Sequence, residues 1–141
     1  NREFFKIKKD NQEIKFLPLI CYEIIYSGNL TNDFNFDLIL NISEDGWFGN
    51  SIGPSQHFAK AIFRAIENNS FLVRSTNKGI SAIIDNKGLV VKKLNKFEAG
   101  NIELQVPLIK SKNKNKNDLI FFLLLITYIF IFKFYKKNNV K

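Results

Sequence analysis

Residues 37–42 have the sequence DLILNI, and this nearly continuous apolar run restricts the possible folds more than any other feature of the chain. A strand with one wet face alternates apolar and polar residues, whereas a strand covered on both faces is apolar at successive positions. We therefore expect residues 37–42 to form a central strand that is covered on both faces.

Other short apolar runs predict further strands. The candidates cover residues 14–20, 71–75, 80–84, 89–91 and 102–106. Pro18 indicates an edge position or an irregular end for the first of them, because proline cannot donate a ladder hydrogen bond. The DNKG sequence at 85–88 favours a tight turn, so the two strands around it are expected to form a hairpin. Residues 1–13 are polar and are expected to be irregular.

Helical segments alternate with these strands. One or two helical turns are expected at residues 23–26, and a helix of about four turns is expected to begin at Pro54, which suits a first helical turn. Apolar residues then recur at helical spacing, at Phe58, Ile62, Ala65 and Ile66. The alternation predicts an α/β fold.

A 14-residue apolar run, Leu119–Phe132, lies near the C-terminus. As a helix it is about 21 Å long, and inclusion of Tyr135 extends it to about 25 Å, the low end of the range that spans a membrane. The run is apolar around its whole circumference and has Lys at both ends, which favours a transmembrane helix over the alternative of a buried core helix. Lys residues are balanced on the two sides, so they do not predict its orientation.

These patterns divide the chain into four parts. Residues 1–108 are expected to fold, 109–117 to be a Lys- and Asn-rich linker, 118–135 to be the transmembrane helix and 136–141 a basic tail. The chain begins with Asn1 and contains no Met, so we expect it to be the C-terminal piece of a longer protein.

The net charge of +8 is concentrated in the last part of the chain. Residues 1–109 hold 13 Lys and Arg against 12 Asp and Glu, whereas residues 110–141 hold eight Lys and one Asp. A basic excess beside an apolar run suits a membrane surface rather than a nucleic acid. With one Cys and one His, an internal disulfide and a zinc cluster are not expected, and no cofactor or metal is predicted.

Cys21 directly follows the first apolar run and precedes the predicted helical turns. A thiol at a helix start lies near partial positive charge, which favours the nucleophilic thiolate. Glu23 is placed to order such a site or to hold a cationic partner. On these residues alone, a buried and inert cysteine remains the alternative.

The polar loop at residues 43–53 carries the only tryptophan, Trp47, beside Phe48. Large aromatics on a glycine-rich loop suit an apolar ligand, an acyl chain or a membrane surface. The alternative is that Trp47 caps the core. His57 is expected to be structural, and the residues around the end of the 71–75 strand, among them Arg74, are expected to be solvated.

Five motifs follow one another along the chain: ICYEII at 20–25, NISEDGWFG at 41–49, SIGPSQHF at 51–58, RAIE at 64–67 and RSTNKGI at 74–80. Together they resemble the apolipoprotein N-acyltransferase family, a branch of the nitrilase, or carbon-nitrogen hydrolase, superfamily. The resemblance covers residues 14–91 in detail. It departs from the family pattern at Glu44-Asp45-Gly46, where Asn-Asp-Ala is expected, and at Lys78, where Asn is more usual.

The resemblance implies a fold and a set of site residues. Residues 1–108 would be the C-terminal portion of an αββα sandwich domain with a Glu–Lys–Cys triad. Cys21 matches the catalytic nucleophile, and Glu23 matches a supporting acidic residue. Tyr22, Trp47 and Phe48 match residues near the lipid-binding pocket. The triad Glu and Lys are expected upstream of Asn1, so this fragment alone is expected to be inactive.

The family's reaction is acyl transfer from a phospholipid, through a cysteine thioester, to the diacylglyceryl-cysteine of an apolipoprotein. The resemblance implies a bacterial inner-membrane enzyme whose catalytic domain faces the periplasm, with lipids and apolipoproteins as partners. The alternatives are a nitrilase-type amidase and an inactive, truncated domain tethered to the membrane.

Overall fold

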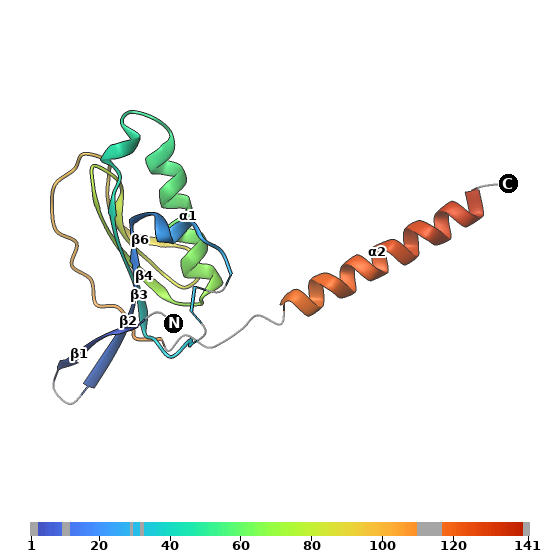
Figure 1. Ribbon diagram of the computed structural model, residues 1–141, viewed down its shortest axis with the longest axis horizontal. Coiled ribbons are helices and arrows are strands. Elements are labelled where there is room, and N and C mark those ends of the chain that lie inside the picture. Colours follow the sequence, from blue (N-terminus) through green and yellow to red (C-terminus); the bar gives the residue numbers. More distant parts are fainter. Residues whose placement is uncertain (1–2, 10–11, 29, 32, 110–116, 140–141) are drawn as a thin grey trace.

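The computed structural model describes residues 3–9, 12–28, 30–31, 33–109 and 117–139 of the chain. The strands are β1 (Phe5–Lys9), β2 (Gln12–Ile20), β3 (Leu38–Glu44), β4 (Phe71–Asn77), β5 (Ser81–Ile84) and β6 (Val90–Leu94). Two 3-10 turns, η1 (Cys21–Ile25) and η2 (Gly46–Phe48), and two helices, α1 (Gly53–Glu67) and α2 (Asn117–Asn139), complete the described elements. In Figure 1, α1 lies against the sheet and α2 stands away from it.

The six strands form one sheet in chain order, from β1 to β6. β2, β3 and β4 are parallel, whereas the other neighbours pair antiparallel. The parallel crossover from β3 to β4 contains α1, as parallel pairing requires a long connection. The mixed sheet with its crossover helix confirms the predicted α/β fold, and β3 is a central strand.

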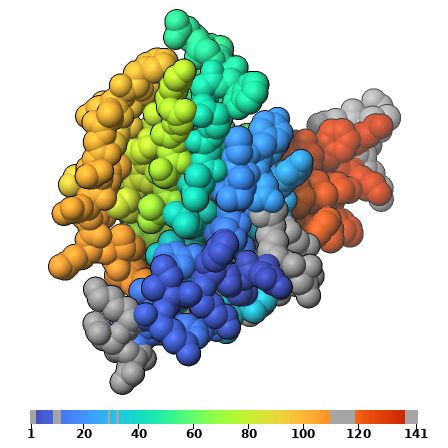
Figure 2. Space-filling model, turned by 60° about the vertical axis from the view of Figure 1, so that its left-hand side comes forward, coloured from blue at the N-terminus to red at the C-terminus, as the bar shows by residue number. Residues whose placement is uncertain are grey.

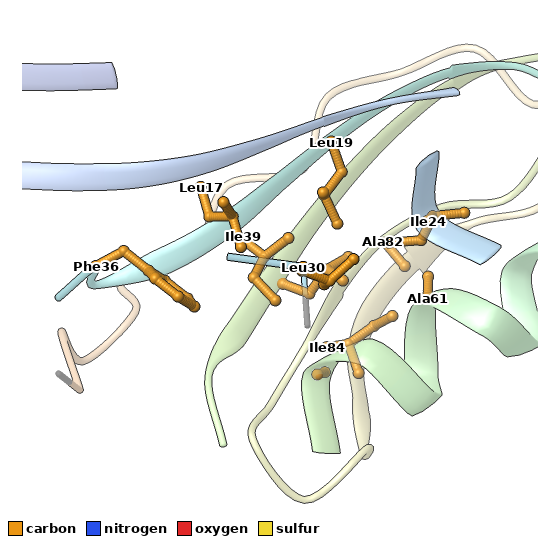
Figure 3. Packing of buried hydrophobic residues seen from close by; sticks show 11 residues of the cluster. Leu17, Leu19, Ile24, Leu30, Phe36, Ile39, Ala61, Ala82 and Ile84 are labelled. Carbon is orange, nitrogen blue, oxygen red and sulfur yellow. The ribbon is translucent and has the colours of Figure 1, made fainter. Parts of the chain in front are cut away.

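The face of the sheet toward α1 is closed by apolar side chains that alternate along each strand. Figure 3 shows these side chains meeting the helix between the two layers. The cluster contains the following buried residues: Leu17, Leu19, Ile24, Leu30, Phe36, Ile39, Ala61, Ala65, Leu72, Ala82 and Ile84. This face is the main core of the molecule.

The opposite face of the sheet is less covered, so the prediction that β3 is covered on both faces is wrong for its C-terminal end. Leu38 is buried there, but Ile42 is 51% exposed and its neighbour Ile20 is 55% exposed. Residues 102–109 cover only the other end of this face, where Ile102 packs near Leu38. Figure 2 shows this orange segment beside the yellow-green and teal strands.

Two further local predictions need correction, and a third agrees with the structure. Residues 5–9 are not irregular, because their apolar and charged residues alternate and pair with β2. Residues 102–106 form no strand, since they lay their apolar side chains over the sheet instead of pairing at its edge. Pro18 matches the predicted edge position, because the ladder between β1 and β2 ends at Phe16 and Pro18 lies beyond it.

α1 forms where the sequence predicts a helix, and Pro54 lies in its first turn. Its buried face is rotated from the predicted apolar stripe, because Ile66 is 46% exposed whereas His57 and Arg64 are buried. Arg64 forms an ion pair with Glu67 at 2.7 Å and also donates to the Tyr26 carbonyl. The contact with Tyr26 attaches α1 to the chain that leaves η1.

α2 begins one residue before the predicted helix 118–135 and ends four residues after it. Its segment Leu119–Lys136 is long and apolar enough to cross a membrane by length and composition, and none of it is buried against the rest of the described chain. Among the described residues, α2 is therefore not packed as a core helix. The predicted linker lies largely outside the described residues, at 110–116.

Candidate active site at the ends of the parallel strands

Cys21 lies immediately after β2, as the first residue of η1. Its φ is +46°, a left-handed conformation that is uncommon for any residue other than glycine and costs about 1–3 kcal/mol. The residue is half-buried, and its Sγ–H donates a long hydrogen bond of 3.9 Å to the Glu44 carbonyl. The sharp turn therefore places the thiol beside the end of β3, and it leaves Cys21 partly exposed to solvent.

The parallel register explains why these groups meet. Ile20 pairs with Ile42, and Ile42 pairs with Ser75, so the carboxyl ends of β2, β3 and β4 lie together. Ligands of open α/β sheets bind at this edge, outside the carboxyl ends of the strands. Cys21 and the loop that follows Glu44 both lie there.

Glu23 and Tyr22 flank the thiol in η1. A carboxylate oxygen of Glu23 accepts a hydrogen bond of 2.7 Å from the Ile20 N–H, which fixes the turn between β2 and η1. Tyr22 is 57% exposed, and its ring lies 6.2 Å from the ring of His57. The structure thus brings both predicted residues to the same turn as Cys21, and their roles remain predictions.

Trp47 and Phe48 occupy η2 and point to different environments. Trp47 is 87% exposed, so it does not cap the core. Phe48 is half-buried, packs edge-on against His57 with 5.6 Å between ring centroids, and lies so close to Gly53 that a Cβ there would clash. One aromatic is thus held against α1 while the other is presented to the surroundings.

A buried polar cluster lies behind this loop. Arg74 donates to both carboxylate oxygens of Asp45, at 2.9 and 3.1 Å, and also to the Asn41 side chain. Asp45 further accepts from Ser43 at 3.1 Å and contacts His57 Nδ1 at 2.8 Å. The cluster thereby joins β3, β4, α1 and the start of η2.

The charges within the cluster support one another. Burial by itself raises the pKa of Asp45, but the hydrogen bond from His57 and the charge of Arg74 outweigh it and hold that pKa below its ordinary value. Burial lowers the pKa of Arg74, and Asp45 opposes this shift. Gly79 packs against Asp45 so closely that any side chain there would displace the carboxylate.

This cluster is the part of the site that the sequence reasoning missed. Arg74 was expected to be solvated, but it is only 2% exposed. Its position was informative, because a charged residue follows three apolar ones in β4 and faces the same side as Leu72. Asn77 and Lys78, at the end of the same strand, are exposed as expected.

Comparison with known proteins gives the family. The profile of the carbon-nitrogen hydrolase family matches residues 2–113. This chain belongs to the carbon-nitrogen hydrolase family. The region that matches the family profile contains the whole sheet, η1, η2 and α1, and therefore all of the candidate site.

Curated relatives carry a more specific name. A protein of Rickettsia bellii named apolipoprotein N-acyltransferase is 43% identical over 129 residues, which are 85% of this chain and 26% of that protein. A protein of the same name from Rickettsia typhi is 47% identical, over 72% of this chain and 20% of its own length. A third protein of this name, from Shewanella oneidensis, is 43% identical over 70% of this chain and 19% of its own length.

These matches confirm the predicted resemblance to apolipoprotein N-acyltransferases. The chain spans about a quarter or less of the length of these relatives. A solved CN-hydrolase superfamily protein from Xanthomonas campestris shares the fold, with a TM-score of 0.52 and 22% identity over 70% of this chain and 42% of that protein. The carbon-nitrogen hydrolase fold is therefore common to this chain and that structure.

Proposed function

We propose that this chain supplies the nucleophile-bearing part of an apolipoprotein N-acyltransferase. The observation that carries the proposal is the position of Cys21, half-buried on a strained turn at the carboxyl edge of the parallel strands. The similarity to relatives of that name supports the choice of acyl transfer within the family. The substrates are a phospholipid acyl donor and the diacylglyceryl-cysteine of an apolipoprotein.

In the first half of the reaction, a carboxylate base takes the Cys21 thiol proton and the sulfur attacks an ester carbonyl of the phospholipid. The sulfur–acyl bond forms as the ester C–O bond breaks, and the lysophospholipid leaves with the proton. A lysine and a backbone N–H would stabilise the oxyanion. The base and the lysine are proposed to lie outside these 141 residues, for which the greater length of the relatives leaves room.

In the second half, the α-amine of the apolipoprotein attacks the thioester. The C–N bond forms, the C–S bond breaks, and the proton of the amine returns to Cys21. Glu23 holds η1 in shape through its bond to the Ile20 N–H, while Tyr22, Trp47 and Phe48 contact the lipid. Because the base and the lysine are proposed to lie outside these 141 residues, the 141 residues alone are expected to be inactive.

We place the protein at the bacterial inner membrane, with the site on the periplasmic side and α2 as a membrane span. The length and apolar surface of α2 support the anchor. The exposure of Trp47 supports contact with lipid, since tryptophan favours the membrane interface. An anchored enzyme would remain at the surface that holds both of its lipid substrates.

The complete polypeptide tests the proposal against the amidase alternative. Reconstituted with phospholipid and a diacylglyceryl-cysteine peptide, it should form an N-acylated peptide and lysophospholipid in equal amounts, measured by mass spectrometry. Water must be excluded from the thioester for this result. Release of free fatty acid without peptide acylation would support a hydrolase instead, and no turnover of either kind would support an inactive domain.

A further inference from the structure

Glu44, the last residue of β3, has a side chain that the chemistry above does not use. Its Oε1 accepts a hydrogen bond of 2.6 Å from the Gly46 N–H, and its Oε2 accepts one of 2.6 Å from the side-chain amide of Asn77. Gly46 begins η2, and Asn77 ends β4. The carboxylate therefore links the end of β3 to both of these elements.

The main chain of Glu44 lies beside the candidate nucleophile. Its carbonyl accepts the 3.9 Å hydrogen bond from Cys21, while the next N–H, that of Asp45, donates to the Asn77 carbonyl at 3.1 Å. This C=O and this N–H belong to one planar peptide unit, so they point in opposite directions and turn together. The orientation of this peptide unit therefore decides whether the carbonyl faces the thiol.

The carboxylate holds the chain on both sides of this peptide unit. Its bond to Gly46 fixes the residue after Asp45, and its bond to Asn77 adds a second attachment to the strand that already binds the Asp45 N–H. A cysteine side chain has a choice of staggered rotamers, and an acceptor in a fixed place favours one of them. Loss of the carboxylate should leave the peptide unit free to turn and the thiol less ordered.

The space around Gly46 is matched to the Glu44 side chain. A Cβ at residue 46 would lie 2.4 Å from Glu44 Oε1, whereas the nearest atom of Lys78 would be 3.2 Å away. The φ of Gly46 is not positive, so alanine adopts this backbone without strain. An alanine at residue 46 would therefore push the carboxylate away from the N–H that it accepts from.

We propose that Glu44 is a positioning residue for Cys21. Its carboxylate holds the peptide unit after Glu44 so that the carbonyl keeps the thiol in one orientation for attack. This role rests on the proposed function, and it assigns a further residue of this chain to the acylation step. A displacement of about 1 Å at a reacting group can slow an enzymatic step by about 100-fold, so a small turn of the thiol matters.

Two substitutions of Glu44 in the complete polypeptide test this role. Glu44→Gln keeps the length of the side chain and an acceptor for the Gly46 N–H, whereas Glu44→Ala removes the attachment. Mass spectrometry of the Cys21 peptide after mixing with phospholipid should show the glutamine variant acylated within about threefold of the unmodified rate, and the alanine variant slower by about tenfold or more. An equal loss in both variants would assign the effect to charge and contradict the role, and no loss in the alanine variant would overturn it.

The dependence on phospholipid concentration separates positioning of the thiol from binding of the lipid. In Glu44→Ala, Asp45 and Phe48 still attach η2 to β4 and α1. The loss should therefore appear in the rate constant at saturating phospholipid, while the half-saturating concentration changes by less than about twofold. A change confined to the half-saturating concentration would mean that the carboxylate serves the lipid-binding loop and not the thiol.

Gly46→Ala is an independent test that retains Glu44. It should slow acylation about as much as Glu44→Ala, because the added methyl group displaces the carboxylate. The double variant should be no slower than either single variant, since the methyl group then meets no carboxylate. Losses that add together in the double variant would contradict the proposal. Should Glu44→Ala not fold, the rate of Gly46→Ala against the unmodified polypeptide decides the question.

Glu98→Ala is the matched control. A carboxylate oxygen of Glu98 accepts from the Asn95 N–H at 2.8 Å and from the Asn95 side chain at 3.1 Å, in the turn that follows β6. Its loss should leave the acylation rate of Cys21 unchanged, and a loss equal to that of Glu44→Ala would contradict a specific role for Glu44. Absence of acylation in the unmodified polypeptide would overturn the proposed function and this role with it, whereas normal acylation in both Glu44→Ala and Gly46→Ala would overturn this role alone.

Discussion

The two faces of the sheet differ sharply, although the same strands form both. On the α1 face, Ile39 and Asn41 are fully buried, and the ion pair of Asp45 and Arg74 is buried as well. On the opposite face, Ile42 is about half exposed. Neighbouring residues of β3 therefore lie in a closed core and on an open surface.

This difference shows that, within this chain, contacts on the α1 face of the sheet hold the candidate site in place. The helix face fixes the loop after β3 through Asp45, and with it Phe48 and the carbonyl that contacts Cys21. The apolar side chains of the open face contribute little to that arrangement. Substitutions on the first face should therefore disturb both stability and the site, whereas those at the exposed end of the second face, around Ile42, should disturb neither in this chain.

The largest effect is expected from Arg74→Met, which leaves Asp45 buried without its cation. Breaking a buried ion pair on one side typically costs about 3–5 kcal/mol. Urea denaturation of the variant should show a loss of this size, and Lys78→Met, at an exposed position, should change stability by about 0.5 kcal/mol or less. An equally small change for Arg74→Met would mean that the cluster does not hold the helix face together.

A matched pair on one strand compares the two faces directly. Ile39→Ala should destabilise the chain by about 2–5 kcal/mol, because it opens a cavity in the closed core. Ile42→Ala removes the same atoms from a half-exposed position and should cost less than about 1 kcal/mol. Equal costs in denaturation experiments would show that the second face is also covered in solution.

A smaller effect on the free energy of unfolding is expected at low pH. The pKa of Asp45 is lowered in the folded chain, so the unfolded chain takes up this proton first as the pH falls. Its contribution to stability is complete above about pH 4 and is lost below it, as the pH approaches the lowered value. The free energy of unfolding of Asp45→Asn should consequently fall less steeply than that of the unmodified chain between pH 5 and pH 2.

The parts of the fold that follow simple patterns could be predicted from the sequence. The apolar run of β3 and the turn chemistry after β5 gave the strands, and Pro54 marked the start of α1. The motif around Cys21 also led, through its resemblance, to the family that the comparisons show, while the role of Cys21 as nucleophile stays a prediction. In each case the local residues themselves carry the signal.

The remaining features depend on tertiary contacts. α1 buries His57 and Arg64, so the face that it turns toward the sheet is not its most apolar face. The helical spacing of apolar residues therefore predicted the wrong buried face for this helix. Arg74 is stable in the core only because Asp45, 29 residues away, reaches the same place. No pattern within a short window of sequence contains that partner.

The most direct test is the search for an acyl group on Cys21 in the complete polypeptide. After incubation with phospholipid and no acceptor, mass spectrometry should find a fatty acyl group on the peptide that contains Cys21, removable by neutral hydroxylamine as a thioester. Cys21→Ser should lack it. An acyl-enzyme that persists in Cys21→Ser, or transfer to the acceptor without any label on Cys21, would contradict the account.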